Sequence, residues 1–179
     1  MVQPMRKLIY IEENFITPDE CQELIDLSLA NKDNVTISDP NVNLEKEIEW
    51  RNHGAVYHGD VYPTVPPLDY DVVTRVNSIC KSFDSTANLD YVGVVRWPVG
   101  RFMKPHVDDN DVHKQDLFAA MLYLNNNFSG GYTCFEDFEV KPEPGKLIIF
   151  SNSQYLHYVS KVEGDERFVL SFWYNSLNK

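Results

Sequence analysis

His106 and Asp108 stand two residues apart near the end of a stretch that reads W-P-V-G-R-F-M-K-P-H-V-D-D. If this stretch is a β-strand, side chains two residues apart point to the same face, so an imidazole and a carboxylate project together. Two imidazoles and one carboxylate on one side of an ion form the facial triad of non-haem Fe(II) centres, which leaves the opposite positions open. The pair therefore predicts two of the three ligands of such a site.

The third ligand would be a second histidine, and the sequence offers four more. His113 lies in the polar stretch D-N-D-V-H-K-Q-D, where we expect it to be solvated. His53 and His58 have no carboxylate at metal-ligand spacing and are better explained as surface or hydrogen-bonded structural residues. His157 follows the apolar run L-I-I-F and precedes another apolar strand, so it is the best candidate. Zinc would accept the same three ligands, since metal availability decides as much as affinity does.

Arg167 follows His157 by ten residues and opens the predicted strand R-F-V-L-S-F-W-Y. A cation that faces inward from a strand is costly unless it meets an anion. A guanidinium binds a carboxylate through two parallel hydrogen bonds, which favours arginine at such a place. The sequence thus predicts a dicarboxylic acid ligand beside the metal.

The ordered set H-V-D, M-L-Y-L-N, G-G-Y-T-C-F, G-K-L-I-I-F, His157 and Arg167 resembles the Fe(II)- and 2-oxoglutarate-dependent dioxygenases, specifically the prolyl 4-hydroxylase-like branch. The earlier segment I-Y-I-E-E-N-F-I-T-P-D-E-C is also typical of that branch. The resemblance implies that His106, Asp108 and His157 are the catalytic iron ligands. It also implies Fe(II), the cosubstrate 2-oxoglutarate and dioxygen as cofactors, with ascorbate as an optional one.

The same resemblance implies a set of residues around the cosubstrate. Arg167 would grip the distal carboxylate of 2-oxoglutarate, and the hydroxyl of Tyr123 would support that carboxylate. A core aromatic is the alternative for Tyr123. Ser171 and Thr133 would add hydroxyl contacts, although core packing explains these two equally well.

Four further positions are candidates for contact with the substrate. Trp97 stands near where a Tyr often approaches the cosubstrate or substrate, and Trp173 matches a Trp that borders the substrate entrance. Either could simply belong to the core. Met103 and Asp116 depart from the branch, whose peptidyl members commonly have Tyr and Arg there. An Asp in place of a cation would favour a basic peptide, a free amino acid or an amine-bearing small molecule.

The activity implied by the resemblance is hydroxylation of a substrate C–H bond, foremost of a prolyl residue in a peptide or protein, with release of succinate and CO2. One alternative is a hydroxylase of free proline, another amino acid or a small metabolite. An alternative of another class is a non-catalytic jelly-roll module that binds a metal or ketoacid. Turnover of 2-oxoglutarate to succinate would separate the module from the enzymes.

Helices near the N-terminus and short strands after them must position these residues. The stretch Thr17–Glu20 is a capping-box pattern and predicts a helix from Pro18 to about Ala30. Its buried side would carry Cys21, Leu24, Ile25 and Leu29. Residues 70–83 have apolar residues at helical spacing and predict a second helix. Strand patterns then recur from residue 91 to about 174, each bounded by turn residues.

This order of elements predicts an α+β, mainly β fold: a double-stranded β-helix, the cupin-like jelly roll, braced by the N-terminal helices. The resemblance implies the same fold. We expect a single oxygenase domain over residues 1–179, with its metal and cosubstrate core in about 91–175.

Composition narrows the partners of the chain. Its 179 residues carry a formal net charge of −11, which speaks against nucleic acid because phosphates are bound by Lys and Arg. No apolar run is long enough to cross a bilayer, so we expect no membrane partner. Cys21, Cys80 and Cys134 are expected to be reduced thiols, which favours a cytoplasmic location. A peptide, protein or small molecule substrate remains as the expected partner, and the sequence does not determine the oligomeric state.

Overall fold

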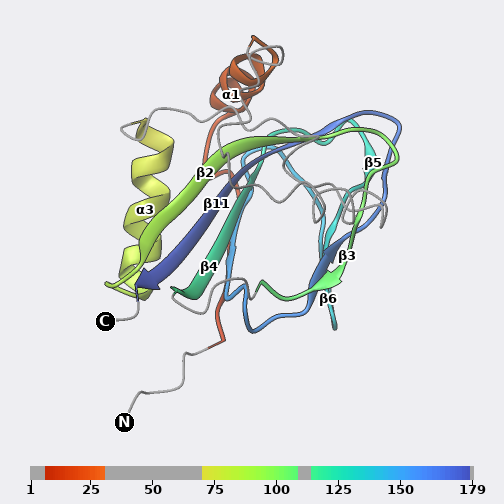
Figure 1. Ribbon diagram of the computed structural model, residues 1–179. Helices are drawn as coiled ribbons and strands as arrows, with labels where there is room; N and C mark the ends of the chain where they lie inside the picture. The colour runs from red at the N-terminus through yellow and green to blue at the C-terminus, as the bar shows by residue number, and fades with distance from the viewer. Residues whose placement is uncertain (1–6, 31–69, 109–113, 178–179) are drawn as a thin grey trace, which may run out of the picture.

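The computed structural model describes residues 7–30, 70–108 and 114–177 of the chain. His53, His58 and His113 lie outside these ranges, so the predictions about them cannot be compared with it. Within the described residues, one strand is followed by two helices and then by a series of strands (Figure 1). In chain order the elements are β1 (Ile9–Glu12), α1 (Pro18–Ala30), α3 (Asp71–Phe83), β2 (Asn88–Trp97), β3 (Met103–His106), β4 (Lys114–Tyr123), β5 (Ser129–Gly130), β6 (Thr133–Phe135), β7 (Glu139–Val140), β8 (Leu147–Phe150), β9 (His157–Val159), β10 (Val162–Glu163) and β11 (Arg167–Leu177).

The strands form two principal antiparallel sheets. The larger has the order β1-β8-β4-β11-β2, and the smaller has the order β3-β9-β6-β7. A short pair, β10 with β5, links Val162 to Gly130. Figure 1 shows α3 beside β2 and β11 on the outside of the larger sheet, with β3 and β6 across from it on the other side. The predicted jelly roll braced by N-terminal helices is confirmed. None of the described helices is long and apolar enough to span a membrane.

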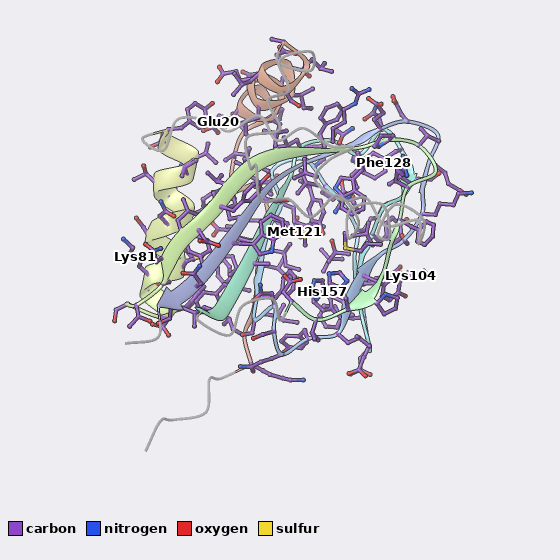
Figure 2. All side chains as sticks on the ribbon, in the orientation of Figure 1. Glu20, Lys81, Lys104, Met121, Phe128 and His157 are labelled. Carbon is purple, nitrogen blue, oxygen red and sulfur yellow. The ribbon has the colours of Figure 1, made fainter. Side chains whose placement is uncertain are left out.

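β11 lies in the middle of the larger sheet, between β2 and β4, and is buried on both faces. Side chains alternate along a strand, and one set packs into the core beneath the helices: Phe168, Leu170, Phe172 and Tyr174. The other set faces the smaller sheet: Arg167, Val169, Ser171 and Trp173. Side chains fill the space between the sheets, with Met121 of β4 and His157 of β9 among them (Figure 2). The strand that packs the core therefore also presents polar groups to an interior cavity.

Helix α1 begins with the predicted capping box. The backbone N–H of Thr17 donates to Glu20 Oε2 at 2.8 Å, and the N–H of Glu20 donates to Thr17 Oγ1 at 3.2 Å. Cys21 and Leu24 are buried as expected, but the expectation for Leu29 was wrong because its side chain is 40% exposed. Leu29 lies one residue from the end of the helix, and Ser28 takes the buried position of that last turn.

Gly145 joins the start of α1 to the end of β4. Its carbonyl accepts from the N–H of Phe15 at 2.7 Å, and its own N–H donates to the carbonyl of Tyr123 at 2.9 Å. Its φ of +82° lies in the left-handed region, and an added Cβ would lie 2.3 Å from the carbonyl oxygen of Ile16. A side chain at this turn would therefore need both a strained backbone and displacement of a neighbour.

We predict that Gly145→Ala lowers the free energy of unfolding by roughly 2–5 kcal/mol, since the left-handed conformation costs about 1–2 kcal/mol and a steric clash about 1–3 kcal/mol. Gly164 is the matched control: its φ is +86°, yet an added Cβ meets nothing within 4 Å. Gly164→Ala should therefore lose only the backbone part. Chemical denaturation of both variants measures the difference, and equal losses would contradict the clash.

Candidate metal centre

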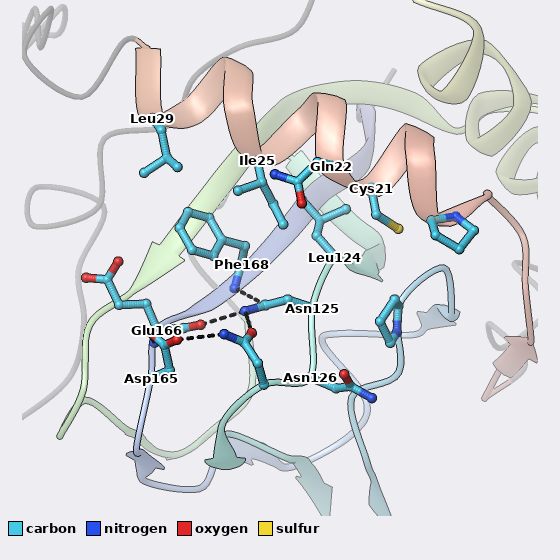
Figure 3. A pocket seen from close by; sticks show the side chains of 13 residues that line it. Cys21, Gln22, Ile25, Leu29, Leu124, Asn125, Asn126, Asp165, Glu166 and Phe168 are labelled. Carbon is cyan, nitrogen blue, oxygen red and sulfur yellow. Dashed lines mark hydrogen bonds between the residues drawn. The ribbon is translucent and has the colours of Figure 1, made fainter.

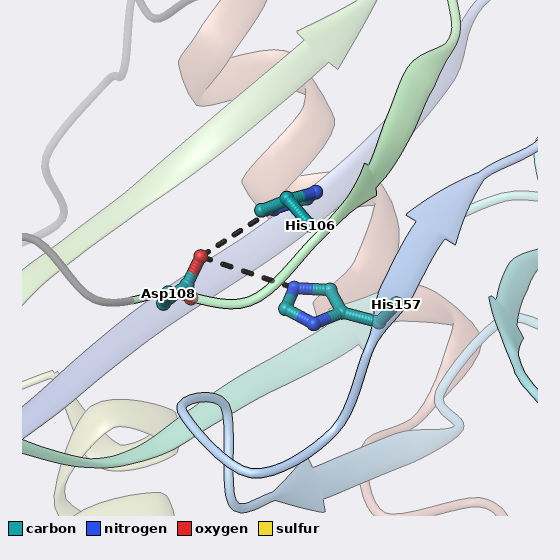
Figure 4. A group of neighbouring side chains, drawn as sticks. All are labelled: His106, Asp108 and His157. Atoms are coloured by element: carbon teal, nitrogen blue, oxygen red, sulfur yellow. Dashed lines mark ion pairs between the residues drawn. The ribbon is translucent and has the colours of Figure 1, made fainter.

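His106, Asp108 and His157 meet at one end of the space between the two sheets (Figure 4). The Oδ1 atom of Asp108 lies 3.4 Å from Nε2 of His106 and 3.9 Å from Nε2 of His157. One ligand atom from each of the three residues lies within 4.8 Å of the other two. Two imidazole nitrogens and one carboxylate oxygen thus face a common point, as a facial triad requires.

The two histidines come from neighbouring strands. β3 ends at His106, which lies opposite His157 at the start of β9. The expectation that His106 and Asp108 share a strand was wrong, because Asp108 lies two residues beyond the end of β3. A second contact replaces the strand pairing: the N–H of Asp108 donates to the carbonyl of Asn152 at 3.2 Å. The side chains of His106 and Asp108 thus point the same way, as the two-residue spacing predicted, but Asp108 is held by the turn between β8 and β9 and not by a strand.

Backbone carbonyls orient both imidazole rings. Nδ1 of His106 lies 2.8 Å from the carbonyl oxygen of Lys104, and Nδ1 of His157 lies 2.9 Å from that of Tyr155. Because a carbonyl can only accept, the proton of each neutral ring belongs on Nδ1 and the lone pair on Nε2. Both Nε2 atoms are the ones that face Asp108. This tautomer is the one that a metal ligand needs.

The charges of the cluster also suit a cation. Burial raises the pKa of Asp108, but the hydrogen bond from His106 and the charge of His157, both in their protonated forms, together with the amide of Asn152, outweigh it and leave the pKa below its usual value. Burial lowers the pKa of His157, with Asp108 only partly opposing. Burial also lowers the pKa of His106, but its contacts with Asp108 and the Lys104 carbonyl raise it more. An ionised carboxylate and a neutral His157 at neutral pH are the forms that bind metal.

Arg167 is fully buried in the same cavity. Its Nε and both terminal nitrogens make no hydrogen bond to any residue that the structure describes. Burial lowers the pKa of Arg167 to about 10, so the guanidinium remains charged at neutral pH. Its Cζ lies 4.9 Å from the ring centre of Trp97 and 5.5 Å from that of Tyr123. A buried cation whose donors are unused fits the carboxylate of a small anionic ligand.

The other predicted cosubstrate residues surround this guanidinium. The hydroxyl of Tyr123 donates to Thr133 Oγ1 at 2.6 Å, and the ring of Tyr123 is fully buried. Thr133 and Ser171 line the cavity together with Arg167. The structure therefore brings all four residues to one place.

The cavity that holds both groups has a volume of about 80 Å³. A single buried water needs roughly 10–15 Å³, so a small molecule fits. Three of the predicted substrate residues, Trp97, Met103 and Trp173, line it. Asp116 lies in β4 opposite Asn175 in backbone register, and its side chain is outside the description. Most of the remaining lining is apolar: Val95, Ala119, Ala120, Met121, Phe150, Val159 and Phe172.

Sequence reasoning missed Asn152. It is fully buried, and its Nδ2 donates to Asp108 Oδ2 at 3.0 Å. A polar residue in S-N-S directly after the apolar run of β8 was the available signal, but such a motif is ordinary in turns. Only the approach of the β8–β9 turn to the end of β3 reveals its role.

A second and larger hollow, of about 520 Å³, lies between α1 and the loops after β4 and before β11 (Figure 3). Its amide groups are occupied: Asn125 donates to the carbonyl of Glu166 at 2.7 Å and accepts from the N–H of Phe168 at 2.8 Å, and Asn127 donates to Asp165 at 2.6 Å. None of the three candidate metal ligands lines this hollow. The larger hollow is therefore not the candidate metal centre, although its volume is greater.

Residues 92–175 match the model of the 2OG-Fe(II) oxygenase superfamily. A protein of Acanthamoeba polyphaga mimivirus that is provisionally named a prolyl 4-hydroxylase is 25% identical over 187 residues, which cover 92% of this chain and 73% of that protein. The matched residues include all three members of the His–Asp–His cluster and Arg167.

Solved structures of similar fold include the viral collagen prolyl hydroxylase of Paramecium bursaria Chlorella virus-1 in complex with 2OG, which is 19% identical, with a TM-score of 0.67 and coverage of 95% of this chain and 96% of that one. A Pseudomonas putida prolyl-4-hydroxylase is 16% identical, with a TM-score of 0.64 and coverage of 95% and 93%. A prolyl hydroxylase of Trichoplax adhaerens, in complex with a hypoxia inducible factor oxygen degradation domain peptide fragment, is 18% identical, with a TM-score of 0.59 and coverage of 94% and 83%. At these identities the likeness concerns the fold.

We predict that Asp108→Ala abolishes binding of Fe(II) under anaerobic conditions, because it removes the only anionic member of the cluster. Equilibrium dialysis with metal analysis measures the affinity. Asp137→Ala, at an exposed position of the β6–β7 turn, is the control and should bind as wild type does. Full Fe(II) affinity in Asp108→Ala would exclude this cluster as the metal site.

Proposed function

We propose that the chain is a prolyl 4-hydroxylase-like, Fe(II)- and 2-oxoglutarate-dependent dioxygenase, as its match to the oxygenase family and to the mimivirus protein supports, and that it hydroxylates a prolyl residue in a peptide or protein, with release of succinate and CO2. One observation carries the proposal: the unpaired, buried guanidinium of Arg167 shares a cavity with the His–Asp–His cluster. An anion-binding group and a metal-binding group at one cavity are what a ketoacid-dependent iron enzyme needs.

In this proposal His106, Asp108 and His157 would hold Fe(II) through Nε2, Oδ1 and Nε2. When bound, Fe(II) together with 2-oxoglutarate and dioxygen would supply the oxidising chemistry, in which the ketoacid loses CO2 and takes up one oxygen atom to become succinate, and the other oxygen atom enters the substrate C–H bond. The hydrogen bonds from Nδ1 to backbone carbonyls keep both rings in the orientation that ligation requires.

Arg167 binds the distal carboxylate of 2-oxoglutarate and thereby orients the ketoacid. Its Nε and terminal nitrogens have no described partner to give up, so the carboxylate supplies hydrogen bonds that are otherwise missing. The hydroxyl of Tyr123 donates to Thr133, which lines the cavity with Arg167, and the ring of Tyr123 lies against the guanidinium. Ser171 lies on the same face of β11 as Arg167 and adds a further hydroxyl to the lining of the cavity.

The apolar walls of the cavity exclude water from the reacting groups. Phe150 packs edge to face on the ring of His157, with ring centres 4.8 Å apart. Met121, Val95 and Val159 are among the other apolar residues that line the cavity. A dry site strengthens the charge interactions inside it and suppresses side reactions.

A prolyl substrate is supported by the names of the mimivirus, Chlorella virus and Trichoplax adhaerens relatives described above, which are those of prolyl hydroxylases, and by the peptide bound to the last of them. Trp97, Met103 and Trp173 line the cavity and are the proposed substrate contacts, with Asp116 retained as a further candidate. The whole chain is proposed to act as one oxygenase domain. A cytoplasmic location is part of the proposal, because Cys21, Cys80 and Cys134 are free and buried.

We predict that Arg167→Ala raises the KM for 2-oxoglutarate by about 100-fold or more, since charge-assisted hydrogen bonds contribute roughly 1.5–3 kcal/mol each. Fe(II) affinity should stay near that of wild type. Arg167→Lys should recover part of the loss, because it keeps the charge without the fork. Arg75→Ala, which removes an arginine paired with Glu20 and Asp71 at the helices, is the control and should leave the KM unchanged. An unchanged KM in Arg167→Ala would refute the assigned cosubstrate site.

We expect the Fe(II)-loaded protein to convert 2-oxoglutarate to succinate in proportion to hydroxylated peptide when it is given proline-containing peptides. Succinate is measured by chromatography, and the peptide by the mass of one added oxygen atom. Free proline and other amino acids form the comparison set. Turnover with free amino acids alone would replace the peptidyl substrate, and an absence of succinate with every substrate would favour a non-catalytic module.

A further inference from the structure

The position of Asp108 raises the question of what holds its carboxylate toward the two histidines. It lies beyond the end of β3, so the strand ladder that fixes His106 against His157 does not reach it. Resting on the proposed function, we propose that Asn152 and Trp173 are positioning residues that bind one oxygen of Asp108 and so commit the other, Oδ1, to the metal.

Asn152 holds Asp108 at two points. Its carbonyl accepts from the backbone N–H of Asp108 at 3.2 Å, and its Nδ2 donates to Oδ2 of the same residue at 3.0 Å. The Asn152 side chain is fully buried. Its turn is itself anchored, because Ser151 donates its N–H to the carbonyl of Leu8 at 3.0 Å and accepts through Oγ from the N–H of Leu8 at 3.1 Å. The amide that reaches Asp108 is therefore supported by a fixed backbone.

Trp173 contacts the same oxygen from the opposite sheet. Its Nε1 donates to Oδ2 of Asp108 at 3.2 Å. The indole packs edge to face against the ring of Tyr91, with ring centres 4.9 Å apart and planes inclined by 67°. Trp173 is on β11 and Tyr91 is its neighbour on β2, so the larger sheet fixes the direction of the N–H.

The two donors give the two oxygens of the Asp108 carboxylate different partners. Oδ2 accepts from Asn152 and Trp173, whereas Oδ1 faces the Nε2 atoms of both histidines. A carboxylate that is free to rotate can offer both oxygens to one metal ion. Here the second oxygen is occupied, so Asp108 would offer a metal Oδ1 alone and would leave another coordination position for the ketoacid.

The test compares Asn152→Leu, which keeps a similar volume without a donor, with Trp173→Phe, which keeps an aromatic ring against Tyr91 without the N–H. Both proteins are titrated with Co(II) alone, whose visible absorption reports affinity and coordination together. Loss of an outer hydrogen bond to a ligand typically weakens metal binding 10–100-fold, and we expect that loss in each variant with an altered Co(II) spectrum. Asn175→Leu is the matched control, because Asn175 is also buried but its amide makes no hydrogen bond to Asp108 or to any other described residue.

Thermal unfolding of the metal-free proteins shows whether each variant is folded. If Asn152→Leu does not fold, Trp173→Phe decides the question. Folded variants that bind Co(II) with wild-type affinity and spectrum would overturn the positioning role and leave the proposed function intact. A wild-type protein that binds neither Co(II) nor Fe(II) would overturn the proposed function, and with it this inference.

Discussion

The alternation of side chains along β11 is the constraint on which the rest of the structure depends. This strand is covered on one face by the helices and on the other by the smaller sheet, so neither set of its side chains is free to face solvent. Its apolar set fixes the sheet against α1 and α3. Its other set must place an arginine, a serine and a tryptophan in the interior. A slip of one residue in the register would exchange the two sets and bury four apolar side chains in the site.

The cost of burying an unpaired Arg167 supports the proposal that the interior on that side is a binding site and not core. An unpaired ion costs several kcal/mol in a protein interior even after relaxation. The contacts with the rings of Trp97 and Tyr123 offset part of this, at about 2 kcal/mol or less each. They do not satisfy the N–H donors of the guanidinium, which need acceptor oxygens. The fold therefore tolerates a local loss of stability that a bound dicarboxylate would recover.

The metal cluster is held by contacts of three different kinds. His106 and His157 are fixed by strand pairing and by carbonyls two residues before them. Phe135 flanks His157 on the other side of β9, which limits the movement of that ring. Asp108 is fixed by a turn from elsewhere in the chain and by an indole from the opposite sheet. Movement of one sheet relative to the other would thus shift the position of the Asp108 carboxylate before it shifted the two histidines, which lie in the same sheet.

The sequence by itself determined the helix α1 with its capping box, the apolar pattern of α3, the succession of short strands, and the identities of His106, Asp108, His157 and Arg167 as groups able to do chemistry. These rest on local periodicity and on residue types, which the chain carries at each position. Only the tertiary structure decided that Asp108 lies outside the strand, that Leu29 is exposed at the end of its helix, and that Asn152 reaches the carboxylate. Those outcomes depend on which segments meet across the two sheets, and contacts between residues far apart in the chain leave no local pattern from which to predict them.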